Sequence, residues 1–319
     1  MYQVIGNDEL AEAADMIFQI GRALNLQLKG SNQWLTEPEC RKCLCSVAES
    51  LDDRLGAVAE LAKFGQIYPF RQLALSECDA PVPTDERPLR VGVYPLAANP
   101  MHWGHILVGL TAMASIRLDK VVFIIAGTDR RKPSMLSADT RHRLGRSVIE
   151  MFHPLFAYSP LALDTDLDGE TNFGRLLRLN SFLRVDAFYI AGADHYRRTT
   201  PEGEADTIAK LERVFEKQGG NLRHTISAVF VDRNGAGREV GKVDTFLDVH
   251  FPPPIPLSLS STAVRRALCR EDLCEASVSL PYSCLLEIRR GGLYGSQGIC
   301  ADGEDCSIAE PSRLGARPC

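Results

Sequence analysis

The sequence contains no hydrophobic run long enough to cross a bilayer, since its longest apolar stretches are Lys120–Gly127 and Val185–Gly192. It also lacks a basic N-terminal segment followed by an apolar one, so we expect a cytoplasmic protein with no membrane partner. Positive charge is not in excess, because 36 Lys and Arg oppose 41 Asp and Glu for a net charge of −5. This balance provides no global field to attract nucleic acid, and any phosphate chemistry must come from a local site.

Cysteine is too sparse for a disulfide-stapled scaffold, with 10 among 319 residues, and we expect most of the thiols to be reduced. Cys40, Cys43 and Cys45 lie close together, and Cys78 is a candidate fourth metal ligand. The cluster falls in an expected helix, where such closely spaced cysteines cannot all face one ion. A metal site stays open as an alternative, while buried or partly buried thiols are favoured.

The chain divides into three regions. Residues 1–85 form a helical region of unknown role, with helical periodicity from Asn7 to Phe64. A Pro- and charge-rich segment at 78–88 favours a domain boundary near residue 85, so that 86–295 form the main domain. The tail at 296–319 is polar and Gly/Pro-rich, and disorder is expected there. We expect the helical region to pack as an independent cap, with packing on the main domain or on a second subunit as alternatives.

From residue 89 onward, short apolar runs alternate with amphipathic helical segments. Expected strands are 89–95, 120–127, 185–192 and 225–232, and expected helices are 105–118, 137–152 and 204–217. The strand runs are apolar without alternation, which is typical of strands buried on both faces. The pattern predicts an α/β fold: a Rossmann-like, doubly wound parallel sheet preceded by the N-terminal helical region.

A first candidate site follows the expected strand at 89–95, where the sequence reads VGVYPLAANPMHWGH. Open α/β sheets bind ligands at the carboxyl ends of their strands. His102 and His105 flank the start of the next helix, where free N–H groups and the helix dipole favour an anion. Gly104 would allow a phosphate to approach the backbone. The alternative is a pair of helix-start histidines with incidental hydrogen bonds.

A second candidate site lies in PLSLSSTAVRRAL at 256–268, where Ser260, Ser261 and Thr262 begin a helix. Hydroxyl groups at a helix start cap free N–H groups and also bind phosphate oxygens, and Arg265 lies one turn later. An ordinary N-cap followed by a surface arginine is the alternative.

Together, the two segments resemble the HxGH and ISSTxxR signatures of the nucleotidyltransferase superfamily. The resemblance extends over about residues 89–295 and is closest to nicotinate or nicotinamide mononucleotide adenylyltransferases. Gly192 and Asp194 resemble a strand ending in GxD, and Arg233 resembles a strand-end arginine. The tryptophan that usually follows GxD is absent, which leaves Tyr196 or Phe215 for its place. The Thr-rich segment of many relatives corresponds to 170–173.

The resemblance implies transfer of AMP from ATP to a mononucleotide acceptor, as in NAD biosynthesis, with Mg²⁺ bound to the ATP. The alternatives are transfer to another phosphorylated acceptor, use of another nucleotide donor such as CTP, or a nucleotide-binding regulator. The preference for nicotinate or nicotinamide and the formation of a homo-oligomer stay open. Lys132 is expected near the phosphates, with a solvated loop lysine as the alternative. Asp194 is expected to contact the nucleotide, with a helix cap as the alternative. The implied catalytic residues are His102, His105 and Arg265. The implied nucleotide contacts are Gly92, Val93, Tyr94, Asn99, Pro100, Gly104, Lys132, Gly192, Asp194, Arg233, Ser260, Ser261 and Thr262.

Overall fold

The structure is a computed structural model that describes residues 7–79, 87–128, 135–196, 206–217, 223–233 and 244–294. The predicted tail at 296–319 and Lys132 lie outside these residues. None of the described helices combines the length and apolar character needed to span a membrane. The strands are β1 (Leu89–Leu96), β2 (Lys120–Ile125), β3 (Phe156–Ser159), β4 (Val185–Gly192), β5 (His224–Val231) and β6 (Asp248–His250). The helices are α1 (Asn7–Trp34), α2 (Pro38–Lys63), α3 (Trp103–Ile116), α4 (Ala138–Glu150), α5 (Gly169–Leu179), α6 (Ala193–Tyr196), α7 (Asp206–Lys217), α8 (Ser261–Cys269), α9 (Leu273–Ser279) and α10 (Tyr282–Arg290).

The strands form one parallel sheet in the order β3-β2-β1-β4-β5-β6. The chain runs from β1 outward to β3 and then returns to the other side of β1 with β4. The strand order therefore reverses between β1 and β4, and the carboxyl ends of these strands border the crevice where such sheets bind ligands. The predicted fold class is confirmed.

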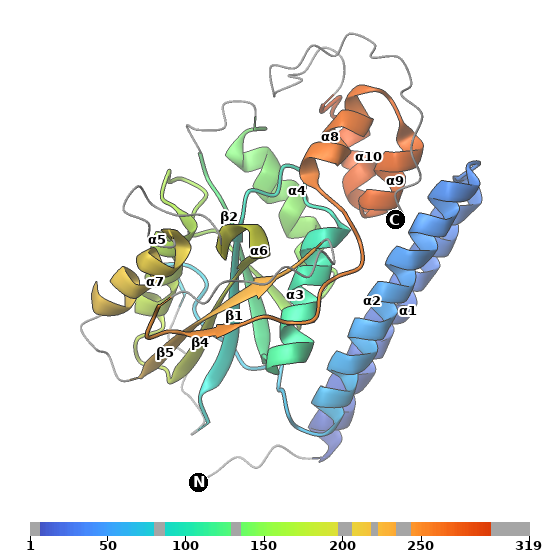
Figure 1. Cartoon of the computed structure of the whole chain (residues 1–319). Helices are drawn as coiled ribbons and strands as arrows, with labels where there is room; N and C mark the ends of the chain where they lie inside the picture. The colour runs from blue at the N-terminus through green and yellow to red at the C-terminus, as the bar shows by residue number, and fades with distance from the viewer. Residues whose placement is uncertain are drawn as a thin grey trace.

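Helices cover both faces of the sheet, as the apolar strands require. Every residue of β2 is buried, so neither face of this strand is open to solvent. Figure 1 shows α5 and α7 on one side of the sheet and α3 on the other, with the paired helices α1 and α2 beyond α3. The two faces accordingly belong to two separate hydrophobic clusters.

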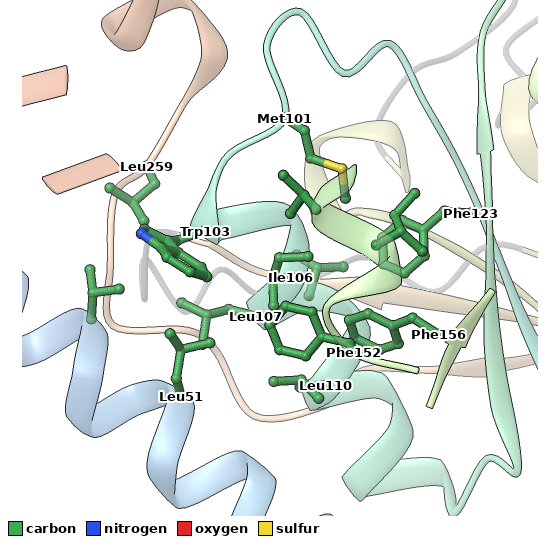
Figure 2. Packing of buried hydrophobic residues seen from close by; sticks show 14 of the residues in the cluster. Leu51, Met101, Trp103, Ile106, Leu107, Leu110, Phe123, Phe152, Phe156 and Leu259 are labelled. Carbon is green, nitrogen blue, oxygen red and sulfur yellow. The ribbon is translucent and has the colours of Figure 1, made fainter. Parts of the chain in front are cut away.

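The N-terminal helices share the hydrophobic cluster of α3. Leu51 of α2 points toward Leu107 of α3 in the core view (Figure 2), and both side chains are buried in that cluster. The Arg54 Nε donates a hydrogen bond to the Thr111 Oγ1 of α3 at 2.6 Å. The expected independent cap is therefore replaced by a joint core, because the apolar face of α2 is buried against α3.

The segment before the predicted boundary is also bound to the sheet domain. Buried Asp119 accepts a hydrogen bond from the Tyr68 backbone N–H at 2.7 Å and lies 3.7 Å from the Arg71 guanidinium. The Asn180 side chain exchanges two hydrogen bonds with the backbone of Ala74, each 2.8 Å long. A boundary near residue 85 stays a prediction, and these contacts cross it.

Candidate active site

Two histidines cap the N-terminus of α3 reciprocally. The His102 Nδ1 accepts a hydrogen bond from the Gly104 N–H at 3.1 Å, and the His105 Nδ1 accepts one from the His102 N–H at 3.2 Å. The two ring centroids are 3.9 Å apart. Because each Nδ1 is an acceptor, each neutral ring carries its proton on Nε2. The start of α3 therefore holds two side-chain N–H groups beside the positive end of the helix dipole.

Both histidines are neutral. Burial, His105 and the Arg233 charge lower the pKa of His102 well below its usual value, and burial and Arg233 lower the pKa of His105 to about 3. The His102 Nε2 is buried and has no hydrogen-bond partner among the described residues. A buried donor without an acceptor costs about 1–3 kcal/mol. A bound phosphate oxygen would remove this cost.

Glycine at position 104 makes room for the His102 ring. A Cβ there would lie 2.8 Å from Cε1 and 2.9 Å from Nδ1 of His102, and 3.2 Å from the Leu259 Cβ. These contacts supply a reason for Gly104 that the sequence prediction of close phosphate approach did not include. The glycine allows the histidine to fold back over its own helix.

The second motif forms the N-terminus of α8 and is bound directly to the first. Ser260 is the N-cap residue and accepts the Ala263 N–H at 3.1 Å. The Ser261 Oγ donates to the Pro100 carbonyl at 3.0 Å, and the Arg265 Nη1 donates to the Asn99 carbonyl at 2.9 Å. The structure therefore brings together two motifs whose arginine and first histidine are 163 positions apart, at residues 265 and 102. In addition, the Arg265 Nη2 donates to the Thr262 Oγ1 at 3.3 Å.

The Asn99 side chain links this loop to two other segments of the chain. Its Oδ1 accepts hydrogen bonds from the Tyr294 hydroxyl at 2.6 Å and from the Leu136 N–H at 3.3 Å. Asn99 is buried, and its amide oxygen is used inside the protein. Its placement supports a role in shaping the loop, while a direct nucleotide contact stays a prediction.

Arg141 of α4 is a site-shaping residue that the sequence prediction missed. Its side chain is buried and donates to the Ala97 and Ala126 carbonyls at 2.7 Å each, and also to Gly127. A single guanidinium thus holds the chain where it leaves β1 and β2. The signal was weak because one arginine in an amphipathic helix is normally a surface residue.

The ends of β4 and β5 bring Asp194 and Arg233 together. The Arg233 guanidinium lies 3.6 Å from the Asp194 carboxylate, and a Cβ at Gly192 would overlap that carboxylate. Gly192 therefore leaves space for the Asp194 side chain to turn back over the strand end. Arg233 also acts electrostatically on His102 and His105, which lie at the start of α3.

Two other predicted contacts, Gly92 and Val93, are not brought to the site. Gly92 lies within β1, where a Cβ would be 2.7 Å from Ile190 and Leu118, and Val93 is fully buried in the opposite cluster. Both positions serve packing. Tyr94 is buried behind His105, with ring centroids 6.3 Å apart, and burial raises its pKa to about 12.

The two aromatic residues proposed for the missing tryptophan lie in different places. Tyr196 follows the GxD segment directly and packs against Phe230 and Phe251, with ring centroids 5.0 and 5.1 Å away. Phe215 instead packs against Phe246, 5.4 Å away. Tyr196 is therefore the better candidate for that position.

A buried acidic group lies where α5 begins, beside the ends of β1 and β4. A Cβ at Gly169 would be 2.7 Å from Pro95 and 2.9 Å from the Tyr189 hydroxyl, so this turn lies against both strands. The next residue, Glu170, is buried and hydrogen-bonded to Tyr189, and burial raises its pKa. Lys210 contacts the neighbouring Asp168 at 3.5 Å. The sequence prediction missed this group, although it includes part of the segment aligned with the family's Thr-rich stretch.

No protein-family model matches the chain. In sequence, it is similar to curated proteins named probable nicotinate-nucleotide adenylyltransferase. One from Thermoanaerobacter sp. (strain X514) is 26% identical over 189 residues, covering 56% of this chain and 83% of the relative. One from Thermus thermophilus is 25% identical over 211 residues, covering 65% of this chain and 100% of the relative. A solved structure of Plasmodium falciparum nicotinic acid mononucleotide adenylyltransferase complexed with NaAD aligns with a TM-score of 0.48 at 15% identity, covering 64% of this chain and 97% of that one.

The sequence matches confirm the resemblance to the nucleotidyltransferase superfamily, and with it the prediction of a nucleotidyltransferase enzyme. Within that class, the chain is similar to the nicotinate-nucleotide adenylyltransferases. The roles of individual site residues, the metal and the acceptor stay predictions.

Proposed function

We propose that the protein transfers AMP from ATP to nicotinate mononucleotide with release of pyrophosphate, a reaction of NAD biosynthesis. The observation that supports this most is the direct link between the N-termini of α3 and α8, through Ser261 to Pro100 and Arg265 to Asn99. Two adjoining helix N-termini offer backbone N–H groups and positive dipole ends over a length that suits several phosphates. The names of the relatives supply the adenylyl group and the acceptor.

In this reaction, a phosphate oxygen of the mononucleotide attacks the α-phosphorus of ATP in line. The new P–O bond forms as the bond to the bridging oxygen breaks, and pyrophosphate leaves with that electron pair. His102 and His105 donate from Nε2 to the phosphate oxygens on which charge builds, and Arg265 binds the β/γ end with the first turn of α8. In the free protein, burial and the Arg233 charge lower the pKa of both histidines, so each is proposed to meet the phosphate as a neutral N–H donor.

Asp194 is proposed to contact the ribose of a bound nucleotide. It lies at the carboxyl end of β4, and its side chain is more than half exposed, so its oxygens are accessible from the crevice. Arg233 restrains the carboxylate from the next strand. The alternative role as a plain helix cap would leave nucleotide affinity unchanged in Asp194→Asn.

Mg²⁺ enters as part of the Mg–ATP substrate. The three metal-ligating side chains that the described residues bring within 4.8 Å of one another are Glu37, Cys40 and Cys274, and these lie outside the site. Asp194 is engaged with Arg233. We therefore expect the Mg²⁺ ion to be held mainly by triphosphate oxygens and water, as is usual for Mg²⁺ bound with nucleotides.

A second candidate, adenylyl transfer to a different phosphorylated acceptor, is favoured by the acidic group at α5. Glu170 is a buried carboxyl group beside the ends of β1 and β4. An acceptor with a carboxylate near this group would be repelled, whereas one with an amide or amino group would find a hydrogen-bond acceptor. The same reasoning favours nicotinamide over nicotinate mononucleotide if the pyridine end lies there.

The test is a screen for pyrophosphate release by the full-length protein with ATP or CTP and Mg²⁺. Acceptors are nicotinate mononucleotide, nicotinamide mononucleotide and a panel of other phosphorylated compounds. Turnover with ATP and nicotinate mononucleotide is expected. Turnover only with another acceptor would establish the second candidate, and ATP binding without turnover on any acceptor would favour a nucleotide-binding regulator.

A further inference from the structure

A group of metal-ligating side chains lies between the N-terminal helices and the C-terminal helices, away from the proposed nucleotide site. One ligand atom each from Glu37, Cys40 and Cys274 lies within 4.8 Å of the other two. Glu37 and Cys40 are at the start of α2, and Cys274 is in α9, so more than two hundred residues separate the two contributions. The cysteines predicted to accompany Cys40, namely Cys43, Cys45 and Cys78, are not part of this group.

The spacing of these atoms suits a tetrahedral ion. With Zn–S and Zn–O bonds of about 2.3 Å and about 2.1 Å, the edges of a tetrahedron are roughly 3.5–3.8 Å. The Cys40 Sγ lies 3.8 Å from the Glu37 Oε2, close to such an edge. Small rotations of the exposed Glu37 side chain and of the two half-buried cysteines would bring all three atoms to bonding distance.

The charges around Cys40 are those that a cation would compensate. The Glu37 and Asp272 carboxylates act electrostatically on Cys40. A divalent ion would offset these negative charges, since it stabilises thiolates and carboxylates together. Soft thiolate ligands with one carboxylate select zinc over magnesium or calcium.

We propose that Glu37, Cys40 and Cys274 bind a zinc ion that joins α2 to α9, with water or an Asp272 oxygen in the fourth position. α2 packs against α9, and α9 packs against α8, whose N-terminus carries Ser260–Thr262. The ion would therefore stabilise the position of α8, the helix proposed to bind phosphate, through its packing on α9. It is a structural site, and the proposal does not depend on the identity of the acceptor.

The experiment measures zinc in the full-length protein purified under reducing conditions without chelator. We expect about one zinc ion per chain in the wild type and in Cys45→Ser, an exposed cysteine on the same helix. Cys40→Ser and Cys274→Ser should each lose most of the zinc, with circular dichroism confirming that they are folded. Cobalt substitution of the wild type provides a second readout, because two thiolates give a sulfur-to-cobalt charge-transfer band.

The proposal fails if the wild type binds no stoichiometric zinc after dialysis against zinc and shows no such cobalt band. It also fails if either serine variant retains zinc as the wild type does. A non-reduced peptide map that links Cys40 to Cys274 in zinc-free protein would assign a disulfide to the pair instead. None of these outcomes depends on adenylyltransferase activity, so the site and the proposed function fail separately.

Discussion

His102, at the start of α3, caps the helix and is proposed to donate to phosphate from the same ring, and His102→Asn separates these two roles. In wild-type protein, Nδ1 of His102 caps the helix by accepting the Gly104 N–H, while the buried Nε2 has no partner among the described residues. The asparagine side-chain oxygen takes the place of Nδ1, and Asn is among the best N-cap residues. The cap should persist while the Nε2 donor is lost.

The expected magnitudes for the two roles differ. A donor directed at developing charge is worth about 3–4 kcal/mol, or roughly 10²–10³ in kcat. Replacing a capping side chain by alanine costs about 1 kcal/mol of folding stability. We therefore expect His102→Asn and His102→Ala to lose kcat to a similar extent, while only the alanine variant shows a clearly lower Tm.

The assay is pyrophosphate release with Mg–ATP and the acceptor found in the screen, alongside thermal denaturation. His153→Asn, at an exposed position, controls for the loss of a histidine in general. A kcat for His102→Asn within a few-fold of wild type, at unchanged Tm, would refute the assignment of Nε2 as a phosphate donor.

Three further predictions concern other parts of the molecule. Gly104→Ala should lower both kcat and Tm, because the added Cβ displaces the buried His102 ring and with it the cap of α3, and unchanged kcat would contradict the contact argument. Glu170→Gln should gain stability relative to wild type as pH rises, because the folded chain holds the Glu170 proton more tightly than the unfolded chain does. Wild-type stability therefore falls as pH rises through the raised pKa of Glu170. Urea unfolding at about pH 5 and about pH 8 tests this, and a relative gain that is larger at the lower pH would have the wrong sign. A truncated protein of residues 86–319 should aggregate because it exposes the α3 surface that α2 covers, and a monodisperse, folded product by size exclusion and circular dichroism would show that the joint core is dispensable.

Much of the fold follows from sequence periodicity. The strands β1, β2, β4 and β5 are confirmed close to their predicted limits, because continuous buried apolar runs between turn residues are distinctive. The short strands β3 and β6, and helix α5, were missed. β3 has four residues and β6 three, with exposed or half-buried positions, so their formation depends on pairing with a neighbouring strand and not on local pattern.

The site was predictable only where its residues lie in recognisable motifs. His102, His105 and Arg265 were predicted as site residues because their spacing follows signatures, and the structure brings the two motifs together through Ser261. Arg141 and the Glu170 group were not identified, since their importance arises from burial against distant backbone or side chains. Likewise, the partner of Cys40 lies in α9, and no local spacing indicates it.

The hydrogen bonds from Ser261 to Pro100 and from Arg265 to Asn99 also bear on how this protein can change in length. The two motifs proposed to bind phosphate are positioned by contact with each other, so the chain between them need only return to the same place. Surface loops along that return path can lengthen or shorten at a small entropic cost, since doubling a loop adds only about 0.6 kcal/mol. Insertions between the motifs can thus alter substrate specificity while the proposed phosphate-binding geometry stays the same.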